Sequence, residues 1–205
     1  MRLTSRAQAV VLALIGLVAS AGVVIMALSN LSGIRPAPLA VLGAVPDFTL
    51  IDQRGRMRSR TSLTGSVWIA DFIFTRCAGQ CPLMSARMAS LDQALARQGG
   101  LRFISFSVDP AHDDPEALAA YGSQYGAREG RWEFLTGSPE AVRALVREGF
   151  MLGLSDDGTP QEPITHSVRF VLIDREGRIR GYYDATEDEA MRRLQADARR
   201  LLREP

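Results

Sequence analysis

The sequence predicts a three-layer α/β domain with a mixed β-sheet, preceded by one transmembrane helix. Short apolar runs typical of buried strands alternate with segments of helical periodicity along most of the 205 residues, which is the pattern of an α/β fold. The chain closes with two strands joined by a tight turn and a final helix, so antiparallel pairing is added to parallel pairing. A long apolar segment near the start predicts the membrane helix. A chain of this length holds one domain and an appendage rather than two full domains.

The first element is the apolar segment. From Ala9 to Leu28, every residue except Ser20 is apolar or small. A helix of about 20 residues spans the roughly 30 Å of a bilayer's hydrocarbon core, so we expect a membrane anchor over residues 9–29. A cleaved signal peptide is the alternative, because Ala27-Leu28-Ser29 has the small-x-small pattern of a cleavage site. The apolar part of a signal peptide usually runs to only about 7–15 residues, which favours the anchor.

The residues around this segment predict its orientation. Arg2 and Arg6 precede it, and the positive-inside rule therefore keeps residues 1–8 in the cytoplasm and sends the rest of the chain across the membrane. We expect a single-pass protein of the cell inner membrane with its domain on the periplasmic side. Residues 30–45 contain glycines, prolines and few charges, as in a tether. The domain itself is then expected at residues 46–205.

The domain is expected to begin with a β-hairpin. Residues 47–51 alternate like a strand, residues 53–56 have turn chemistry, and residues 57–63 return as a second strand. The next run, residues 67–74, is almost continuously apolar, as in a strand buried on both faces of a sheet. Asp71 interrupts that run, so its carboxyl group must be neutral, paired or at a bulge if it is buried.

Helices and strands then alternate. Apolar residues recur at helical spacing after Pro82 until Gly99 and Gly100 end the pattern. Residues 101–108 form another expected strand. Asp114, followed by a proline, predicts the start of a helix that continues to about Tyr125.

The last part of the domain repeats this alternation once more and then forms a hairpin. Residues 132–135 read as a short strand, and Ser138 caps a helix that reaches about Phe150. Two strands, residues 168–173 and 178–183, are joined by a turn, and a final helix follows over residues 187–203.

Both cysteines of the chain, Cys77 and Cys81, lie between the first buried strand and the helix after it. Pro82 favours the first helical position, which places Cys77 in the loop and Cys81 near the helix N-terminus. Free amide groups and the helix dipole there, with the charge of Arg76, favour thiolates. Two small core residues are the alternative interpretation. Two cysteines so close together at a strand-to-helix junction instead favour a disulfide or a soft-metal site.

His166 follows the least regular stretch, residues 152–165, which we expect to be a surface loop. Such a loop can fold over the strand-to-helix junction and bring an imidazole beside two thiolates. This donor set suits copper, because sulfur satisfies Cu(I) and nitrogen helps to accommodate Cu(II). A structural zinc site normally needs a fourth protein ligand. A hydrogen-bonded loop histidine is the alternative interpretation.

Two residues after the strand at 101–108 complete the candidate site. Asp109 ends that strand on the same side as Cys77, and we expect it to support the ligands without binding the metal. His112, the only other histidine, lies among acidic and proline residues typical of a helix start. We therefore expect His112 to be exposed to solvent.

The composition excludes some functions. The 24 basic and 23 acidic residues nearly balance, so nothing attracts the chain to nucleic acid in general, and we expect no nucleic-acid partner. All of the basic residues are arginines, which excludes Schiff-base chemistry on a lysine. Two cysteines are too few for a disulfide-stapled scaffold.

An ordered set of motifs resembles the Sco/SenC family over Pro46 to about Leu202. In chain order the motifs are Asp-Phe-Ile-Phe-Thr-Arg-Cys-Ala-Gly-Gln-Cys-Pro at 71–82, Phe-Ser-Val-Asp-Pro at 106–110 with Asp-Pro at 114–115, Phe-Leu-Thr-Gly at 134–137, Thr-His-Ser at 165–167, and Phe-Val-Leu-Ile-Asp at 170–174. Ala78 departs from the proline often found after the first cysteine, and the residues before His166 lack a frequent acidic neighbour. Neither departure removes a ligand.

The resemblance implies a thioredoxin-like fold in which Cys77, Cys81 and His166 bind copper. It also implies a role in assembling the binuclear copper centre of cytochrome c oxidase. The expected partner is the copper-bearing subunit of that oxidase or another copper acceptor. We therefore expect a metallochaperone rather than an enzyme, with Cys77 and Cys81 also able to form a redox disulfide.

Three other functions stay open. A thiol–disulfide oxidoreductase would reduce the cysteines of copper sites or cytochromes, but its motifs usually place two residues between the cysteines and need no histidine. A peroxidase would need a Pro-x-x-x-Thr/Ser-x-x-Cys sequence, which residues 72–76 do not supply. A copper-responsive sensor or scaffold is the third alternative.

Overall fold

The computed structural model describes residues 12–22, 24–25, 37–155 and 164–204. The chain divides into two compact units, Met1–Pro38 and Leu39–Pro205. In the first unit, residues 12–22 and 24–25 are helical. Among the described residues, none of the helices combines the length and the apolar character needed to cross a membrane. The anchor expected over residues 9–29 lies partly outside the described residues, so it stays a prediction.

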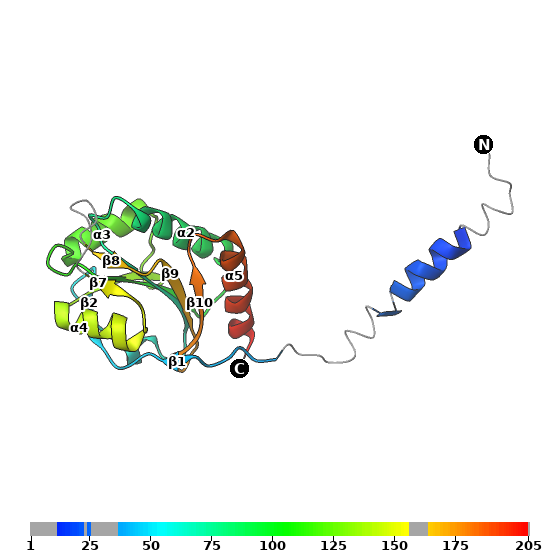
Figure 1. Ribbon diagram of the computed structural model, residues 1–205, viewed down its shortest axis with the longest axis horizontal. Helices are drawn as coiled ribbons and strands as arrows, with labels where there is room; N and C mark the ends of the chain where they lie inside the picture. Colours follow the sequence, from blue (N-terminus) through cyan, green and yellow to red (C-terminus); the bar gives the residue numbers. More distant parts are fainter. Residues whose placement is uncertain (1–11, 23, 26–36, 156–163, 205) are drawn as a thin grey trace. The chain divides into compact units, whose positions relative to one another are not determined.

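The second unit is built on an eight-stranded sheet with the order β1-β10-β9-β4-β5-β6-β2-β3 (Figure 1). Strands β4, β5 and β6 are parallel, and the other neighbouring pairs are antiparallel. The predicted mixed sheet is therefore confirmed. The strands are β1 (Gly43–Ala44), β2 (Thr49–Asp52), β3 (Met57–Ser59), β4 (Val67–Ile73), β5 (Leu101–Ser107), β6 (Trp132–Thr136), β9 (Arg169–Ile173) and β10 (Arg178–Asp184).

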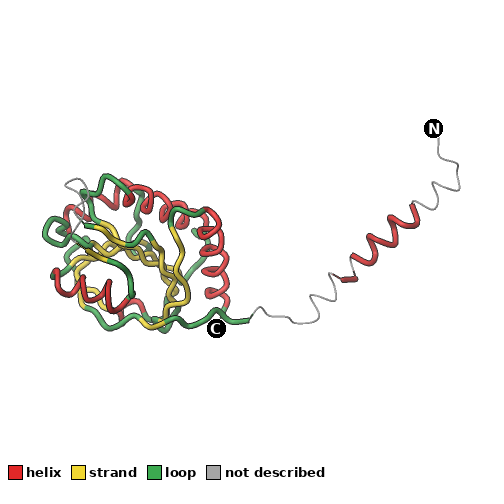
Figure 2. Tube along the Cα trace, in the orientation of Figure 1, coloured by secondary structure: helices red, strands yellow, loops and turns green. Residues whose placement is uncertain are grey.

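Helices cover both faces of this sheet, which gives the three layers (Figures 1 and 2). Figure 1 shows α2 and α4 on opposite sides of the sheet, with α5 beside α2. The helices are α2 (Gln80–Ala94), α3 (Pro115–Gln124), α4 (Pro139–Ala144) and α5 (Asp188–Arg203), with a 3-10 turn η1 (Arg60–Leu63) and a π-helical turn η2 (Leu145–Gly149) that continues α4. The side chains of Asp114 and Ser138 accept the N-cap hydrogen bonds of α3 and α4, as predicted.

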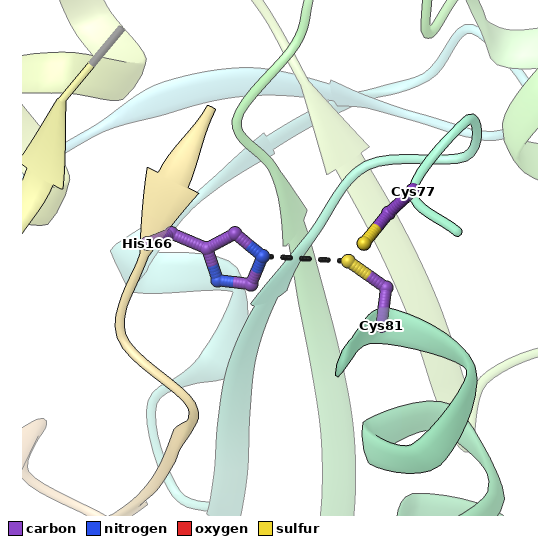
Figure 3. Close-up of side chains that lie close together, drawn as sticks. All are labelled: Cys77, Cys81 and His166. Carbon is purple, nitrogen blue, oxygen red and sulfur yellow. Dashed lines mark hydrogen bonds between the residues drawn. The ribbon is translucent and has the colours of Figure 1, made fainter. Parts of the chain in front are cut away.

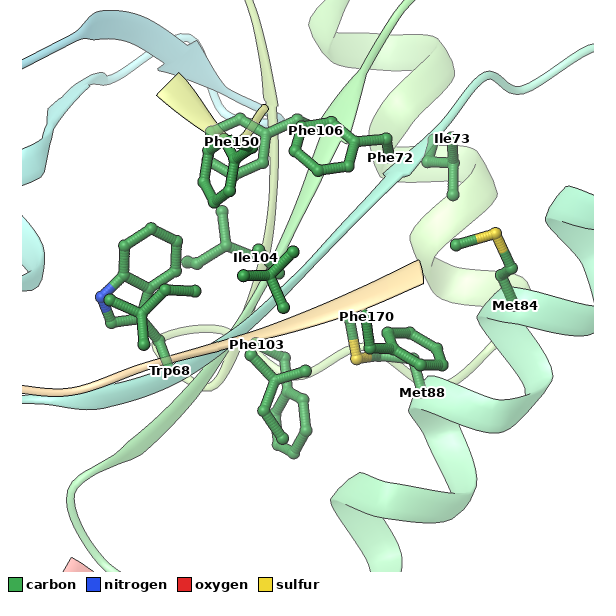
Figure 4. Packing of buried hydrophobic residues seen from close by; sticks show 14 of the residues in the cluster. Trp68, Phe72, Ile73, Met84, Met88, Phe103, Ile104, Phe106, Phe150 and Phe170 are labelled. Atoms are coloured by element: carbon green, nitrogen blue, oxygen red, sulfur yellow. The ribbon is translucent and has the colours of Figure 1, made fainter. Parts of the chain in front are cut away.

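Large apolar side chains fill the space between the layers (Figure 4). Phe72 packs against Phe106 and Phe150, with ring centroids 5.5 and 5.0 Å away. On the side of α2, Met84 and Met88 reach towards the sheet in Figure 4, and both are fully buried. This burial fixes α2 on strand β4, and with it the first turn of α2, where Cys81 lies.

Asp71 lies inside this core on β4, at 0% exposure. Its strand pairs with β5 without a bulge, and neither carboxyl oxygen has a hydrogen-bond partner among the described residues. Burial raises the pKa of Asp71 to about 7. Of the three states expected for a buried Asp71, the structure therefore favours the neutral one below pH 7.

Three boundaries differ from the predictions. Helix α2 begins at Gln80 instead of at Pro82, because a proline in the first turn lacks only an amide that would be unpaired anyway. The compact unit begins at Leu39 rather than at residue 46, and β1 joins the expected tether to the edge of the sheet. Residues 152–165 were expected to be a loop, but this stretch contains a short strand, Leu154–Ser155 (β7), which pairs with Thr165–His166 (β8). Residues 156–163 lie outside the described residues.

Candidate metal centre

The structure brings together the three predicted ligands, Cys77, Cys81 and His166. One ligand atom from each residue lies within 4.8 Å of the other two, and Figure 3 shows the imidazole facing the two sulfur atoms. Nε2 of His166 is 3.3 Å from Sγ of Cys81. Among the described residues, this is the one group of three or more histidine, cysteine, aspartate or glutamate side chains that lie closely enough together to hold a metal ion.

Each ligand comes from a different element. Cys77 lies in the loop after β4, where its amide donates to the carbonyl oxygen of Phe74 at 3.2 Å. Cys81 lies in the first turn of α2 and is fully buried. His166 lies in β8, opposite Leu154 of β7. Residues distant in sequence therefore meet because the loop, the helix and the β7–β8 pair converge at the carboxyl end of β4.

The imidazole of His166 has a defined orientation. Its Nδ1 is 3.1 Å from the carbonyl oxygen of Ser167, and because a carbonyl only accepts, Nδ1 carries the proton. Nε2 faces Cys81, and in the neutral imidazole this nitrogen carries the lone pair that binds metals. Phe74 packs edge-on against the ring at a centroid distance of 5.8 Å. A packed and hydrogen-bonded ring is a preorganised ligand.

The two thiols differ in acidity. Burial raises the pKa of Cys77, but hydrogen bonding to His166, to Cys81 and to backbone amides outweighs it and lowers this pKa to about 7. Burial and the neighbouring Cys77 raise the pKa of Cys81 well above its usual range. The pair therefore shares one thiolate near neutral pH, and the proton of Cys81 is displaced when a metal binds.

Asp109 contacts two side chains, those of Arg76 and His112. Asp109 accepts from Nε of Arg76 at 2.5 Å and lies 2.9 Å from Nδ1 of His112. Burial of Asp109 is outweighed by Arg76 and His112, so the pKa of this carboxyl is lowered. Asp109 thus contacts Arg76, the residue before Cys77, and the supporting role expected of Asp109 stays a prediction. The imidazole of His112 is 55% exposed, as predicted.

The sequence does not predict one buried carboxyl group near the site, that of Asp113. Asp113 is 0% exposed and accepts hydrogen bonds from Thr75 and Ser107. In the sequence it reads as part of the helix start, beside the true N-cap Asp114. The Asp-x-x-x-Asp spacing of Asp109 and Asp113 was visible, but their partners depend on the fold.

The donor set fits a soft metal ion. Both cysteines are free thiols, so both sulfurs are available. Bonds of about 2.0–2.3 Å from nitrogen and sulfur keep donor atoms within roughly 4.6 Å of one another, and the present spread of 4.8 Å requires only small shifts. Two sulfurs and one nitrogen satisfy copper in both oxidation states better than they satisfy Mg²⁺ or Ca²⁺.

Solved structures with the same fold include several Sco proteins. A SCO1/SenC family lipoprotein from Bacillus anthracis has a TM-score of 0.74 and 30% identity, over 80% of this chain and 99% of its own. BsSco, a Sco family cytochrome c oxidase assembly protein with a disulfide switch, has a TM-score of 0.68 and 31% identity, over 78% and 98%. Copper-bound ScoI of Bradyrhizobium japonicum, at TM-score 0.66 and 23% identity over 77% and 99%, shares the fold. The predicted thioredoxin-like fold of the Sco family is thus confirmed.

Sequence comparison gives the same result. The SCO1 protein homolog of Bacillus subtilis is 34% identical over 146 residues, which cover 70% of this chain and 75% of that protein. A family model described as SCO1/SenC matches residues 41–203, which include β1, the three ligands and the last helix. The chain therefore belongs to the SCO1/SenC family.

Proposed function

We propose that this protein binds one copper ion through Cys77, Cys81 and His166 and delivers it to an acceptor during assembly of cytochrome c oxidase. The observation that carries the proposal is the convergence of two free thiols and an oriented imidazole within 4.8 Å. Support comes from relatives, one of which is a cytochrome c oxidase assembly protein and another of which holds copper. The copper-bearing oxidase subunit is the proposed acceptor, and another copper protein is the alternative.

The geometry supports transfer as well as binding. Copper is the cargo here, and its ligands come from a loop, a helix turn and a two-residue strand rather than from one rigid element. Cys77 is 9% exposed while Cys81 is fully buried, so an incoming ligand reaches the Cys77 side first. Three protein ligands leave room for a fourth from an acceptor, which permits exchange without releasing a free ion.

Copper stoichiometry of the purified full-length protein tests the proposal. The wild type should bind one copper per chain. Cys77→Ser and Cys81→Ser should abolish tight binding, and His166→Ala should weaken Cu(II) binding severely while leaving Cu(I) on the two sulfurs at reduced affinity. His112→Ala is the matched control, since it removes the only other histidine. Full stoichiometry and affinity in either cysteine variant would exclude this site.

A thiol–disulfide oxidoreductase is the second candidate. The lowered pKa of Cys77, to about 7, gives a nucleophilic thiolate beside a second thiol, and BsSco has a disulfide switch. His166 separates the two functions, because thiol exchange does not require an imidazole ligand. In cells grown at low copper, His166→Ala should lose oxidase assembly if copper delivery is the function. Normal assembly with His166→Ala, together with failure of Cys81→Ala, would favour the reductase.

The membrane anchor belongs to the same proposal. We infer a single-pass helix over residues 9–29 in the cell inner membrane with the copper domain in the periplasm, supported by the apolar sequence and by Arg2 and Arg6 before it. Alkaline phosphatase fused after Pro205 should be active, because this reporter folds only outside the cytoplasm. An inactive fusion beside an active cytoplasmic reporter would contradict the orientation.

A further inference from the structure

Asp113 is a buried carboxyl group whose partners lie in the segment that leads to Cys77. Its side chain is fully buried. Oδ1 accepts from Oγ1 of Thr75 at 2.6 Å, and the amide of Thr75 lies 3.3 and 3.2 Å from the two carboxyl oxygens. Oδ2 accepts from Oγ of Ser107 at 2.6 Å. Both donor groups of Thr75 are thus held by one carboxyl group, two residues before a metal ligand.

The turn that follows β5, residues 107–113, also holds Arg76, the residue after Thr75. Ser107 ends β5, and its Oγ accepts from the amide of Asp109 at 3.1 Å. The amide of Asp113 donates to the carbonyl oxygen of Asp109 at 3.0 Å, which closes the turn on itself. Asp109 in turn binds the guanidinium of Arg76. One closed turn after β5 therefore fixes Thr75 through Asp113 and Arg76 through Asp109.

This arrangement bears on Cys77 because that residue has no regular element of its own. Cys81 is positioned by α2 and His166 by β8. Cys77 lies in the loop between β4 and α2, where its amide makes a turn-type hydrogen bond to the carbonyl oxygen of Phe74. Its sulfur also lies against the backbone amides of Gly79 and Cys81, and the direction from which the chain approaches them is set by what fixes Thr75 and Arg76. Of their two carboxyl partners, Asp113 is the fully buried one, shielded from competing water.

We propose that Asp113 is a positioning residue of the copper site, which holds Cys77 in ligand geometry through Thr75. The inference rests on the proposed copper function. Ligand-supporting hydrogen bonds of this kind typically change metal affinity by about 10–100-fold. Cu(II), which uses the imidazole as well as both sulfurs, should be more sensitive than Cu(I), which two sulfurs can hold alone.

Asp113→Ala and Asp113→Asn test the proposal in the full-length protein. The alanine variant should lower Cu(II) affinity about 10–100-fold and change the sulfur-to-copper charge-transfer band. The asparagine variant should restore most of both, because its oxygen still accepts from Thr75 and its amide can donate to Ser107. Asp114→Ala is the matched control, since it removes the neighbouring N-cap of α3 and leaves Thr75 untouched. Wild-type affinity in Asp113→Ala, or an equal loss in Asp114→Ala, would overturn the proposal.

A copper-free measurement separates this inference from the proposed function. In the equilibrium of the dithiol with oxidised glutathione, Cys77 and Cys81 form one disulfide and two glutathione thiols are released. Asp113→Ala should favour the protein disulfide several-fold less than the wild type, because Cys77 is no longer held near Cys81. Asp114→Ala should match the wild type. If the glutathione equilibrium of Asp113→Ala equals that of the wild type, the positioning role is contradicted. If that equilibrium changes but the wild type binds no copper, only the copper function is contradicted.

Thr75→Val completes the test, since valine keeps the amide and the shape of threonine but removes its hydroxyl. It should weaken Cu(II) binding in the same direction as Asp113→Ala. The double variant should be no weaker than Asp113→Ala alone, because the two residues act through one contact. Additive losses would show that Asp113 acts elsewhere and would overturn the proposal.

Discussion

Cys77 and Cys81 have the same side chain but different chemistry in this fold. The thiolate is the reactive form of cysteine, and the pKa of Cys77 is lowered to about 7 while that of Cys81 is raised. Iodoacetamide should therefore modify Cys77 first in the reduced, metal-free protein, at a rate that rises as the pH increases through about 7. Peptide mass spectrometry at a series of pH values measures this. Faster modification of Cys81, or a midpoint at the usual thiol value, would contradict the assigned acidities.

Asp71 should make stability depend on pH. Its pKa is raised from 3.8 to about 7 in the folded protein, so the folded state binds more protons than the unfolded state between these values. Its contribution to stability is then fully present below pH 3.8 and is lost as the pH rises through 7. Asp71→Asn should accordingly gain stability relative to the wild type between pH 4 and 8, by a few kcal/mol at most.

Urea unfolding of both proteins at the two pH values measures this gain. Asp47→Asn is the control, because the side chain of Asp47 is 80% exposed. A gain for Asp71→Asn that is equal at both pH values would show that Asp71 does not titrate in this range.

The chemistry at the residue scale was largely predictable from the sequence. Cys77, Cys81 and His166 were identified from residue type and from their places beside a strand end and a helix start. Asp71 was recognised as an unusual residue within an apolar run. The role of Asp113 was not predictable, because its partner Thr75 lies 38 residues away and the contact exists only once β4 and β5 pair.

At the scale of elements, the strands and helices with long periodic patterns were predicted correctly, and the shortest strands were not predicted. The buried strands β4 and β5 and helix α5 have long, regular patterns, and their predicted ranges are close to the observed ones. Strands β1, β7 and β8 have two residues each, which is too short for a pattern. They form because neighbouring strands offer hydrogen-bond partners, so only the assembled fold reveals them.

Arg180 shows how such a short strand is fixed to the domain. Its side chain is 4% exposed and pairs with Asp174 at 2.7 Å. It also donates to the carbonyl oxygens of Leu39 and Ala40, just before β1. Removing one partner of a buried ion pair leaves the remaining groups unsatisfied and typically costs about 3–5 kcal/mol.

Arg180→Met should therefore lower the free energy of unfolding by about 3 kcal/mol, while Arg178→Met should lower it much less, because solvent screens an exposed ion pair. Arg178 is the matched control because it contacts the same Asp174 but is 44% exposed. Urea denaturation of the two variants gives the comparison. Equal effects would mean that the buried contacts to Leu39 and Ala40 add nothing to stability.

At the scale of the whole molecule, the tether and the ligands meet the sheet at opposite ends. Gly43 pairs with Ile179, Ile179 with Ile173, and Ile173 with Trp68 near the start of β4. Cys77 follows the other end of β4. Within the described residues, the chain therefore joins the sheet at the end remote from the three ligands.

X-ray absorption spectroscopy of the copper-loaded full-length protein tests whether Cys77, Cys81 and His166 bind the metal, because it identifies the atoms bound to copper. We expect two sulfur ligands and at least one imidazole nitrogen on Cu(II), with the nitrogen contribution lost in His166→Ala and kept in His112→Ala. A wild-type spectrum with only nitrogen and oxygen ligands, or one that is unchanged in His166→Ala, would contradict the site formed by Cys77, Cys81 and His166.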